Sequence, residues 1–549
     1  MTTSDARTSA RSQSPASRRQ HRLRVGIFSG YDPRPWVMRD CAEHDIAVLL
    51  DLVARLEQSG NYDIVFPGRA MKGYDRLCHS QELCERYAAA FDRARVDAIV
   101  NVHQTWTFPQ TSQKVVSSFA QKLKARDATA RPRLVMVSIQ DTTVPGMVSG
   151  MATGGAFHQN GESFVHVYGD FASGQTLAEL TATLDLFAAR AAAENKVRAV
   201  VAGLHRLHAI EFGSFSLQMP TTRIDQEELT RRWGITSESL DQQVFLDRAF
   251  AMFEWQGQPG LSAIDRTLDR RVARAVEKNY DADPKRFGII PGRSVSRDKY
   301  ALQLAMYYAT FDIAREKGAG AVTIKCQDEC SGRYATCCMA TSFLGNDVDP
   351  LGEQKPMIPT SCETDLPTMY SQYLLKELSG KPAGFGDFRY VATNRRGETM
   401  LAIVNCGQHP VYYAGNEADS TAAKMAQVEY PGQEHFYAAG GAAVRMRTGA
   451  DQDVTVARLG VENGRLYLVA TLMRTTAVSK RRHQAYNPSW PIIEGRVPVT
   501  DKVLGKRWPS NHLGFVYGDW IAALIELAER MGIGYLIWDR NGVEYSKPS

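Results

Sequence analysis

Several features that would place the protein in a special class are missing from its sequence. No apolar run approaches the roughly 18 residues that a membrane-spanning helix needs, so a transmembrane protein is excluded. Glycine and proline together make up about an eighth of the 549 residues, without a repeat, which excludes a collagen-like or low-complexity chain. With 44% hydrophobic and 23% charged residues, the composition is that of a soluble globular protein.

The body of the chain also lacks an excess of charge of either sign. The formal net charge is +5, but residues 1–24 contain six arginines and one acid, Asp5, and account for all of it. The body therefore has no global electrostatic reason to bind nucleic acid. Because the arginine-rich segment has no apolar core, it is not a secretory signal. We predict that residues 1–21 are a disordered tail, with an organelle transit peptide as the alternative.

Cysteine is sparse, with nine residues in the whole chain. An odd number in a large chain without a secretory signal indicates reduced thiols and a cytoplasmic protein. Four of the cysteines are clustered, at Cys326, Cys330, Cys337 and Cys338, but only the first two have the spacing of a zinc-binding pair. We predict that they are small buried side chains around a functional site, with zinc ligation as the alternative.

The length predicts two to four packed units. In the first, residues 22–175, short apolar runs alternate with amphipathic segments, which is typical of a parallel sheet covered on both faces. The expected strands are Leu23–Phe28, Tyr62–Val65, Ala98–Val102, Leu134–Val137 and Phe164–Tyr168. The expected helices are Ile46–Leu56, Gln81–Ala94, Thr111–Ala125 and Gln175–Ala193, and a glycine-rich passage lies at Gly146–Gly155.

A second doubly wound α/β domain is predicted over residues 176–360. Its strands are expected at Val197–Leu204 and Ala321–Lys325, and its helices near residues 225–233, 237–255, 263–278 and 296–317. Residues 361–549 are expected to form a β-rich domain, because turn signals at Asn394–Gly397 and Glu462–Gly464 separate short strand-like runs. A helix at Asp519–Met531 and a strand at Gly534–Trp538 are expected to close the chain.

Polar residues follow several of these segments at positions where ligands bind in open α/β sheets. They are Gln327, Asp328 and Glu329 after a strand, Glu363 and Asp365 at a helix start, and His512. Two carboxylates and an imidazole suit an oxygen-preferring divalent cation. Taken singly, each has a plainer explanation: the helix-start acids as caps, the strand-end acids as a turn, and the histidine as a hydrogen-bonded loop residue.

Three segments carry a resemblance to a known family: Ile324–Glu329, Cys362–Asp365 before a helix, and Trp508–His512 before Tyr517–Asp519. Four others agree in order and spacing: Gly30–Trp36, Asn101–Trp106, Gly213–Asp225 and Phe436–Met446. Over roughly residues 22–540 the chain resembles the L-fucose isomerase and L-arabinose isomerase superfamily. The resemblance implies an α/β fold with two doubly wound Rossmann-like domains plus a C-terminal β-rich, barrel-like domain that completes a metal site.

The resemblance implies a metal-dependent aldose–ketose isomerase that binds Mn²⁺, or Mg²⁺ or Co²⁺, on two carboxylates and a histidine. Carried over to this chain, the histidine is His512 and one carboxylate is Asp365, with Glu363 as the next-best match. The other carboxylate is expected to be Glu329, with Asp328 as an alternative. The family pattern places an acid nearer residues 336–339, where this chain has none.

The implied reaction moves a proton between C2 and C1 of a free sugar through a cis-enediol, with the metal as Lewis acid. Glu329 and Asp365 are expected to be the acid–base pair. The residues expected to contact the sugar are Arg34, Trp106, Gln327, Tyr437, Trp508 and Asn511. The monosaccharide is expected to be of the L-fucose, D-arabinose or L-arabinose type.

The resemblance further implies a cytoplasmic homotrimer or homohexamer with sites near subunit interfaces, and no nucleic-acid or membrane partner. Two alternatives stay open. The basic run Lys480–His483 would suit an anionic phospho- or sulfo-sugar. A non-catalytic sugar-binding paralogue of the fold is the other alternative, although a pure binder does not need two acids and an imidazole.

Overall fold

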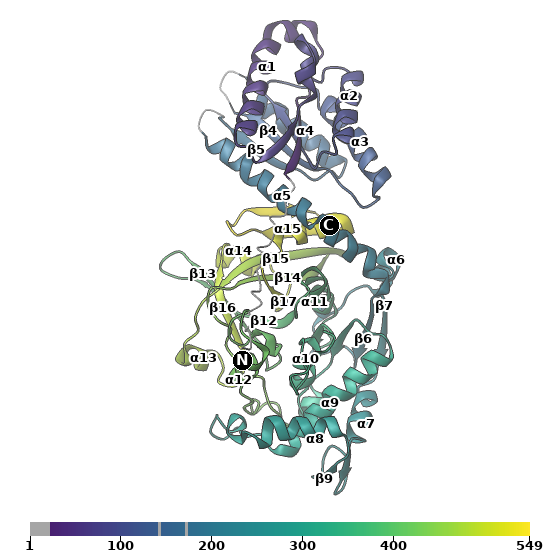
Figure 1. Cartoon of the computed structure of the whole chain (residues 1–549), viewed down its shortest axis with the longest axis vertical. Helices are drawn as coiled ribbons and strands as arrows, with labels where there is room; N and C mark the ends of the chain where they lie inside the picture. Colours follow the sequence, from purple (N-terminus) through teal and green to yellow (C-terminus); the bar gives the residue numbers. More distant parts are fainter. Residues whose placement is uncertain (1–21, 141–143, 171–173, 549) are drawn as a thin grey trace, which may run out of the picture. The chain divides into compact units, whose positions relative to one another are not determined.

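The computed structural model describes residues 22–140, 144–170 and 174–548. The chain divides into two compact units, one ending at Ala192 and the other beginning at Ala193. Helix α5 (Gln175–Gly203) runs across this boundary (Figure 1). The expected disordered tail, residues 1–21, lies outside the described residues. Among the described helices, none is long and apolar enough to cross a membrane.

The first unit is built on a five-stranded parallel sheet in the order β2-β1-β3-β4-β5. Its strands are β1 (Leu23–Phe28), β2 (Tyr62–Val65), β3 (Ala98–His103), β4 (Arg133–Ile139) and β5 (Val165–Gly169). The connecting helices are α1 (Pro35–Gln58), α2 (Gln81–Arg93), α3 (Pro109–Arg126) and α4 (Gly146–Gln159). The strands and helices expected here are confirmed, and the glycine-rich passage forms most of α4.

Burial explains why these residues form this sheet. Every residue of β3 is buried, which matches the continuous apolar runs of a sheet covered on both faces. Helix α2 turns Leu83, Tyr87 and Phe91 inward and begins where the Ser80 side chain accepts a hydrogen bond from the backbone N–H of Leu83. In this strand order the chain leaves β1 and β3 in opposite directions, so a crevice opens at their carboxyl ends.

The second unit begins with a four-stranded parallel sheet in the order β11-β10-β6-β7. Its strands are β6 (His208–Phe212), β7 (Thr236–Leu240), β10 (Ala321–Ile324) and β11 (Thr360–Cys362). The helices of this part are α6 (Gln226–Trp233), α7 (Gln242–Phe250), α8 (Arg270–Val276), α9 (Arg297–Glu316), α10 (Cys338–Gly345) and α11 (Leu366–Ser379). Ile324 pairs with Cys362, so the segments that follow β10 and β11 leave the sheet side by side.

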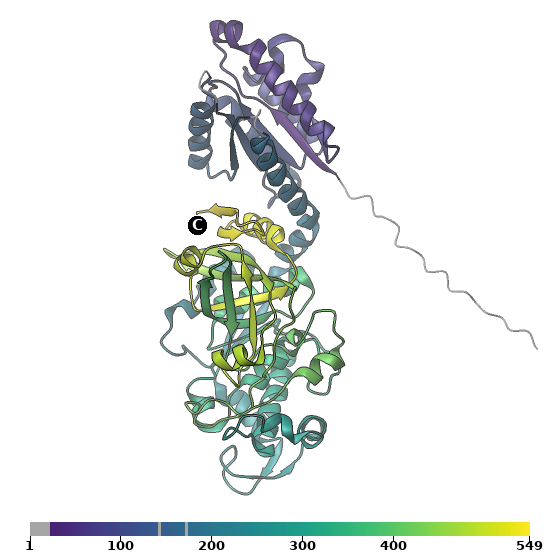
Figure 2. The same ribbon diagram turned by 90° about the vertical axis from the view of Figure 1, so that its left-hand side faces the viewer.

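Six antiparallel strands then close a barrel in the order β14-β17-β12-β13-β16-β15, with β15 returning to β14 (Figure 2). They are β12 (Gly384–Thr393), β13 (Thr399–Val404), β14 (Asp453–Glu462), β15 (Arg465–Thr475), β16 (Ile492–Val497) and β17 (His512–Tyr517). Strands β18 (Gly534–Trp538) and β19 (Glu544–Lys547) continue the sheet from β15. Helices α12 (Thr421–Gln427), α13 (Lys480–Tyr486), α14 (Asp501–Arg507) and α15 (Ile521–Met531) lie between or after these strands. The predicted fold class, with parallel sheets and a C-terminal barrel, is confirmed.

The strand expected at Val197–Leu204 is wrong, because most of this segment is the end of α5. Val197, Val200 and Leu204 are buried three to four residues apart, which is helical spacing. A short apolar run of this kind does not separate a buried helix from a buried strand by itself.

Two expected helices also begin later than the sequence suggested. Residues 237–255 contain most of β7, then α7, then β8 (Phe253–Trp255), and residues 263–278 contain β9 (Ile264–Thr267) ahead of α8. The side chains of Asp241 and Asp269 accept hydrogen bonds from backbone N–H groups at the starts of α7 and α8. These two caps fix where the helices begin and leave the preceding residues extended.

Candidate active site

The ends of two neighbouring strands in the second unit bring polar side chains together. Gln327 follows β10 and Glu363 follows β11. The Nε2 group of Gln327 lies 3.2 Å from Glu363 Oε1 and 3.3 Å from Tyr437 Oη. Parallel pairing of β10 with β11 places both residues at the same edge of the sheet.

Glu363 is presented by an unusual turn. Glu363 and Thr364 have φ values of 58° and 51°, in the left-handed region that residues other than glycine seldom adopt. The Thr364 hydroxyl donates a hydrogen bond to the carbonyl oxygen of Ser214 at 2.8 Å, which ties the turn to the segment after β6. Such conformations cost about 1–3 kcal/mol each and are concentrated at functional sites.

The barrel supplies the other half of the site. His512 begins β17 and is paired directly with Asp387 of β12, so the two side chains share one face of the barrel sheet. His512 Nε2 lies 3.1 Å from Glu363 Oε2 and 3.4 Å from Asp387 Oδ1. Asp387 Oδ2 accepts a hydrogen bond from Asn405 Nδ2 at 3.0 Å. Two carboxylates therefore converge on one imidazole nitrogen.

Asp365 lies on the opposite side of the same imidazole. Its Oδ2 atom is 2.7 Å from His512 Nδ1 and 2.8 Å from Nη1 of Arg458, and its Oδ1 atom caps α11 by accepting from Thr368 N at 2.8 Å. Burial raises the pKa of Asp365, but the charge of Arg458 and the hydrogen bond with His512 outweigh burial and hold that pKa well below its usual range. Asp365 is thus a charged carboxylate whose oxygens are already engaged.

The surroundings of His512 decide its charge. Burial lowers the pKa of the imidazole, whereas its hydrogen bonds to Asp365, Asp387 and Glu363 raise it well above its ordinary value. These three carboxylates therefore favour a protonated ring, in which both nitrogens are donors. Across the described residues, no group of three or more His, Cys, Asp or Glu side chains already has the spacing of metal ligands.

The donor set nevertheless fits a divalent cation by its chemistry. Glu363 and Asp387 offer the hard carboxylate oxygens that suit Mn²⁺ or Mg²⁺, and the Nε2 atom of His512 adds one imidazole nitrogen. The Asp387 side chain is 34% exposed, so this side of the group is open to solvent. A cation would displace the Nε2 proton, since a metal-bound histidine must be deprotonated at the ligating nitrogen.

The structure does not bring Glu329 into this group. Glu329 is ion-paired with Lys325 at 2.6 Å, and its side chain is 54% exposed. It lines a separate hollow with Asp241, Gln242 and Arg333, whose lining does not include Glu363, Asp387 or His512. Asp328 is exposed in the same hollow.

Of the expected sugar contacts, Gln327 contacts Glu363, and Tyr437 contacts Gln327. Trp508 is 9% exposed, packs against Phe388 at 5.8 Å and donates its Nε1–H toward the backbone oxygen of His512 at 3.3 Å, so it supports the strand that carries the histidine. Asn511 is exposed, and its backbone oxygen accepts from Phe388 N at 2.6 Å.

The remaining two expected sugar contacts lie in the first unit, at the carboxyl ends of β1 and β3. Arg34 is held by the buried Asp32, with Nε 2.9 Å from Oδ2, and its guanidinium lies 5.8 Å from the ring centres of Trp36 and Phe108. Trp106, after β3, is half-buried. Both therefore border the crevice that this strand order creates.

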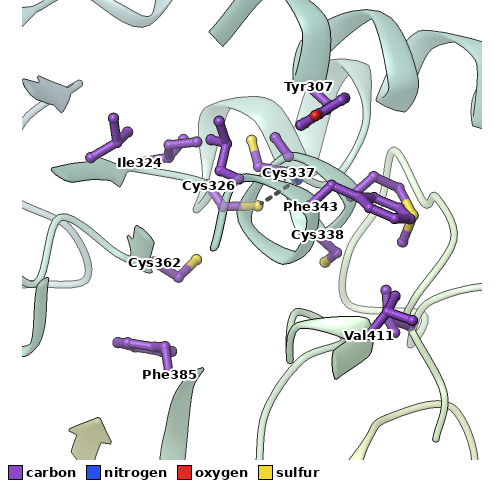
Figure 3. Close-up of a cluster of buried hydrophobic side chains, with 14 of the residues drawn as sticks. Tyr307, Ile324, Cys326, Cys337, Cys338, Phe343, Cys362, Phe385 and Val411 are labelled. Atoms are coloured by element: carbon purple, nitrogen blue, oxygen red, sulfur yellow. Dashed lines mark hydrogen bonds between the residues drawn. The ribbon is translucent and has the colours of Figure 1, made fainter. Parts of the chain in front are cut away.

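Several buried cysteines lie close together in the second unit. Figure 3 shows Cys326, Cys337, Cys338 and Cys362 among buried apolar side chains, where the backbone N–H of Cys337 donates to Cys326 Sγ at 3.2 Å. Cys326 and Cys362 directly precede Gln327 and Glu363. All nine cysteines of the chain fall within the described residues and are free thiols.

Two residues of the basic run Lys480–His483, Arg482 and His483, already contact other groups of the protein. Arg482 forms a bidentate pair with the buried Glu494, and the buried His483 hydrogen-bonds the backbone oxygen of Trp490 at 2.5 Å. Burial lowers the pKa of His483 to about 4, so this ring is neutral near pH 7. His483 is therefore not a cation that could bind an anionic sugar, and the charge of Arg482 is already paired with Glu494.

Comparison with known protein families covers more than half of the chain. Residues 22–197 match the first N-terminal domain of L-fucose isomerase, and residues 403–539, which include His512, match its C-terminal domain. Glu363 and Asp387 lie between the two matched segments, so their place in the site comes from the geometry alone. No curated protein sequence matches the chain. Both matched domains are those of a sugar isomerase, and the chain belongs to the L-fucose isomerase family.

Proposed function

We propose that the protein is a divalent-metal-dependent aldose–ketose isomerase of a free sugar of the L-fucose, D-arabinose or L-arabinose type. The observation that carries this proposal is the convergence of Glu363 and Asp387 on His512 Nε2, at 3.1 and 3.4 Å. It occurs in a chain whose residues 22–197 and 403–539 match domains of L-fucose isomerase.

Glu363, Asp387 and His512 are the residues that would hold Mn²⁺, or Mg²⁺ or Co²⁺. When bound, the cation supplies a Lewis acid that polarises the sugar's carbonyl group and makes the C2 proton more acidic. This ligand set replaces the one expected from the sequence, because Asp365 points away from the open side of His512 and Glu329 lies in another hollow.

The two carboxylates also suit the proton transfer. Glu363 comes from the turn after β11 and Asp387 from the barrel, so they approach a bound sugar from different elements. One carboxylate removes the proton from C2 and a carboxylic acid returns a proton to C1, while the hydroxyl proton passes from O2 to O1. The sugar's C2–H bond breaks and a C1–H bond forms, so an enediol lies between aldose and ketose.

Gln327 and Tyr437 are suited to orient the substrate. Tyr437 is 6% exposed, and its hydroxyl lies next to the Gln327 amide, which contacts Glu363. Both groups donate and accept hydrogen bonds, as sugar hydroxyls require. Asn511, immediately before β17 and next to His512 in the chain, adds an exposed amide.

We also propose that Arg34 and Trp106 serve a site in another copy of the chain, within a homotrimer or homohexamer. An arginine fork beside aromatic surfaces suits sugar hydroxyls on one side and an apolar sugar face on the other. Mixing a protein that lacks Arg34 with one that lacks Asp387 would restore activity if sites are shared between subunits.

The test of the function is ketose formation from a panel of free aldoses by EDTA-treated protein, with and without Mn²⁺. We expect Mn²⁺ to restore turnover of sugars that share the C2–C4 configuration of L-fucose. Turnover of phospho- or sulfo-sugars alone would instead support the anionic alternative. Mn²⁺ binding without turnover of any aldose would support a sugar-binding paralogue.

A further inference from the structure

A buried ion pair lies directly behind the candidate metal site. The side chains of Asp365 and Arg458 are 0% and 1% exposed and meet at 2.8 Å. Neither oxygen of Asp365 is free to reach a substrate, because Oδ1 caps α11 and Oδ2 accepts from both His512 and Arg458. The pair therefore acts on the site only through His512.

The contact with Asp365 determines which nitrogen of His512 is available at the front. An ionised carboxylate is an acceptor only, so the Nδ1 atom of His512, 2.7 Å away, must carry a proton. The Nε2 atom then faces Glu363 and Asp387 and can offer its lone pair once its own proton leaves. A carboxylate behind a histidine orients metal ligands in this way in many proteins.

Arg458 fixes the position of that carboxylate. From β14, its Nη1 atom contacts Asp365, the Thr368 hydroxyl and the backbone oxygen of His512, and its Nη2 atom donates to the backbone oxygen of Thr221 at 2.7 Å. One rigid guanidinium thus joins α11, β14, β17 and the segment after β6. A lysine, with a single ammonium group, would not hold all of these acceptors.

We propose that Asp365, held by Arg458, is a positioning residue that presents the Nε2 atom of His512 to a divalent cation. This inference rests on the proposed function. It assigns to Asp365 neither ligation of the metal nor acid–base chemistry, and it makes the ion pair a determinant of metal affinity.

The test is the Mn²⁺ affinity of the full chain carrying Asp365→Asn, measured by calorimetry and by the electron paramagnetic resonance of free Mn²⁺. Asparagine keeps the helix cap but cannot accept at both oxygen positions, because one becomes an NH₂ donor. We expect the Kd for Mn²⁺ to rise by about 10- to 100-fold. The kcat at saturating Mn²⁺ and the KM for the sugar should stay within about threefold of the wild-type values, because Asp365 does not touch the substrate.

The matched control is Asp225→Asn. Asp225 caps α6 by accepting from Glu228 N at 3.0 Å and is exposed, so this variant makes the same change of charge at another helix start. Its Mn²⁺ affinity should equal that of the wild type. Should Asp365→Asn fail to fold, Arg458→Lys tests the same pair and should weaken Mn²⁺ binding as well.

Three results would overturn the proposal or its basis, and they differ. Unchanged Mn²⁺ affinity in folded Asp365→Asn, or in Arg458→Lys, would refute the positioning role while leaving the metal site intact. Loss of kcat at saturating Mn²⁺ with unchanged affinity would make Asp365 a catalytic residue instead. Absence of Mn²⁺ binding by the wild type would refute the proposed metal-dependent function itself.

Discussion

Replacing Asp387 by asparagine separates the site seen in the structure from the one expected from the sequence. The carboxylate faces His512 Nε2 at 3.4 Å with one oxygen and is anchored by Asn405 with the other. Asparagine has the same size and keeps one oxygen, but it neither accepts a proton nor carries the charge that a cation requires. The variant thus loses the negative charge and the proton-accepting group of Asp387 but keeps the size of its side chain.

The expected magnitude follows from this geometry. The Asp387 side chain is 34% exposed, so the substitution leaves no buried void and should change the free energy of unfolding by less than about 1 kcal/mol. Loss of a positioned general acid or base lowers the rate by about 10²- to 10⁴-fold, which corresponds to about 3–5 kcal/mol in activation free energy. We expect kcat/KM at saturating Mn²⁺ to fall by at least about 10²-fold.

The assay is ketose formation at saturating Mn²⁺, with thermal unfolding measured on the same sample. Glu329→Gln is compared in parallel, and its kcat/KM should stay within about threefold of the wild type because Glu329 is paired with Lys325 in a separate hollow. A folded Asp387→Asn protein with more than a tenth of the wild-type kcat/KM would refute the reasoning. Loss of activity in Glu329→Gln would restore the assignment made from the sequence.

Three further outcomes are expected. Mn²⁺ at about a hundred times its Kd should stabilise the protein by about 2.7 kcal/mol and raise its melting temperature, and Glu363→Gln should abolish that shift. Burial lowers the pKa of His103 to about 3, so the unfolded state takes up a proton below pH 6.5 that the folded state does not. Because of His103, the free energy of unfolding measured in urea should thus fall by about 2 kcal/mol between pH 7 and pH 5. The same pH dependence in His103→Gln as in the wild type would contradict this. A Cβ atom at Gly384 would lie 2.2 Å from the ring of Phe515, so Gly384→Ala should lower the free energy of unfolding by about 1–3 kcal/mol, and an unchanged urea midpoint would show that the ring moves aside.

The sequence predicts those parts of the site that depend on local pattern. The apolar runs of β10 and β11 and the polar residues after them are contiguous in the chain, and the rule for parallel sheets places Gln327 beside Glu363. His512 is likewise found from a local motif, Trp508–His512. Each of these residues follows from periodicity and from the residues next to it.

Asp387 could not be found in this way. It reaches the site because β12 pairs with β17 in a register that sets Asp387 opposite His512, 125 positions later in the chain. That register depends on closure of the barrel, and no turn or short motif specifies it. The residues around Asp387 carry only the pattern of an ordinary strand.

The sequence identifies Glu363 and Asp365 as candidate ligands, but it does not separate their roles. They are two residues apart, and only the left-handed turn at Glu363 and Thr364 sends their side chains to opposite sides of His512. One signal was present: Asp365 stands just before Leu366-Pro367, and an acid ahead of proline at a helix start is typical of a cap. The capping role is real, and the same carboxylate has a second contact that only the fold reveals.

The site therefore depends on a junction within the second unit rather than on a single motif. The parallel sheet supplies Glu363, and the barrel supplies Asp387 and His512. Neither part holds two carboxylates and the imidazole by itself, so the donor set exists only when sheet and barrel are packed together. The buried Arg458 of β14, which contacts both the start of α11 and β17, stabilises that junction at the point where the ligands meet. Substitutions next to this guanidinium should therefore change metal affinity more strongly than substitutions of exposed acids such as Glu329, although Glu329 lies closer to Glu363 in the sequence than Arg458 does.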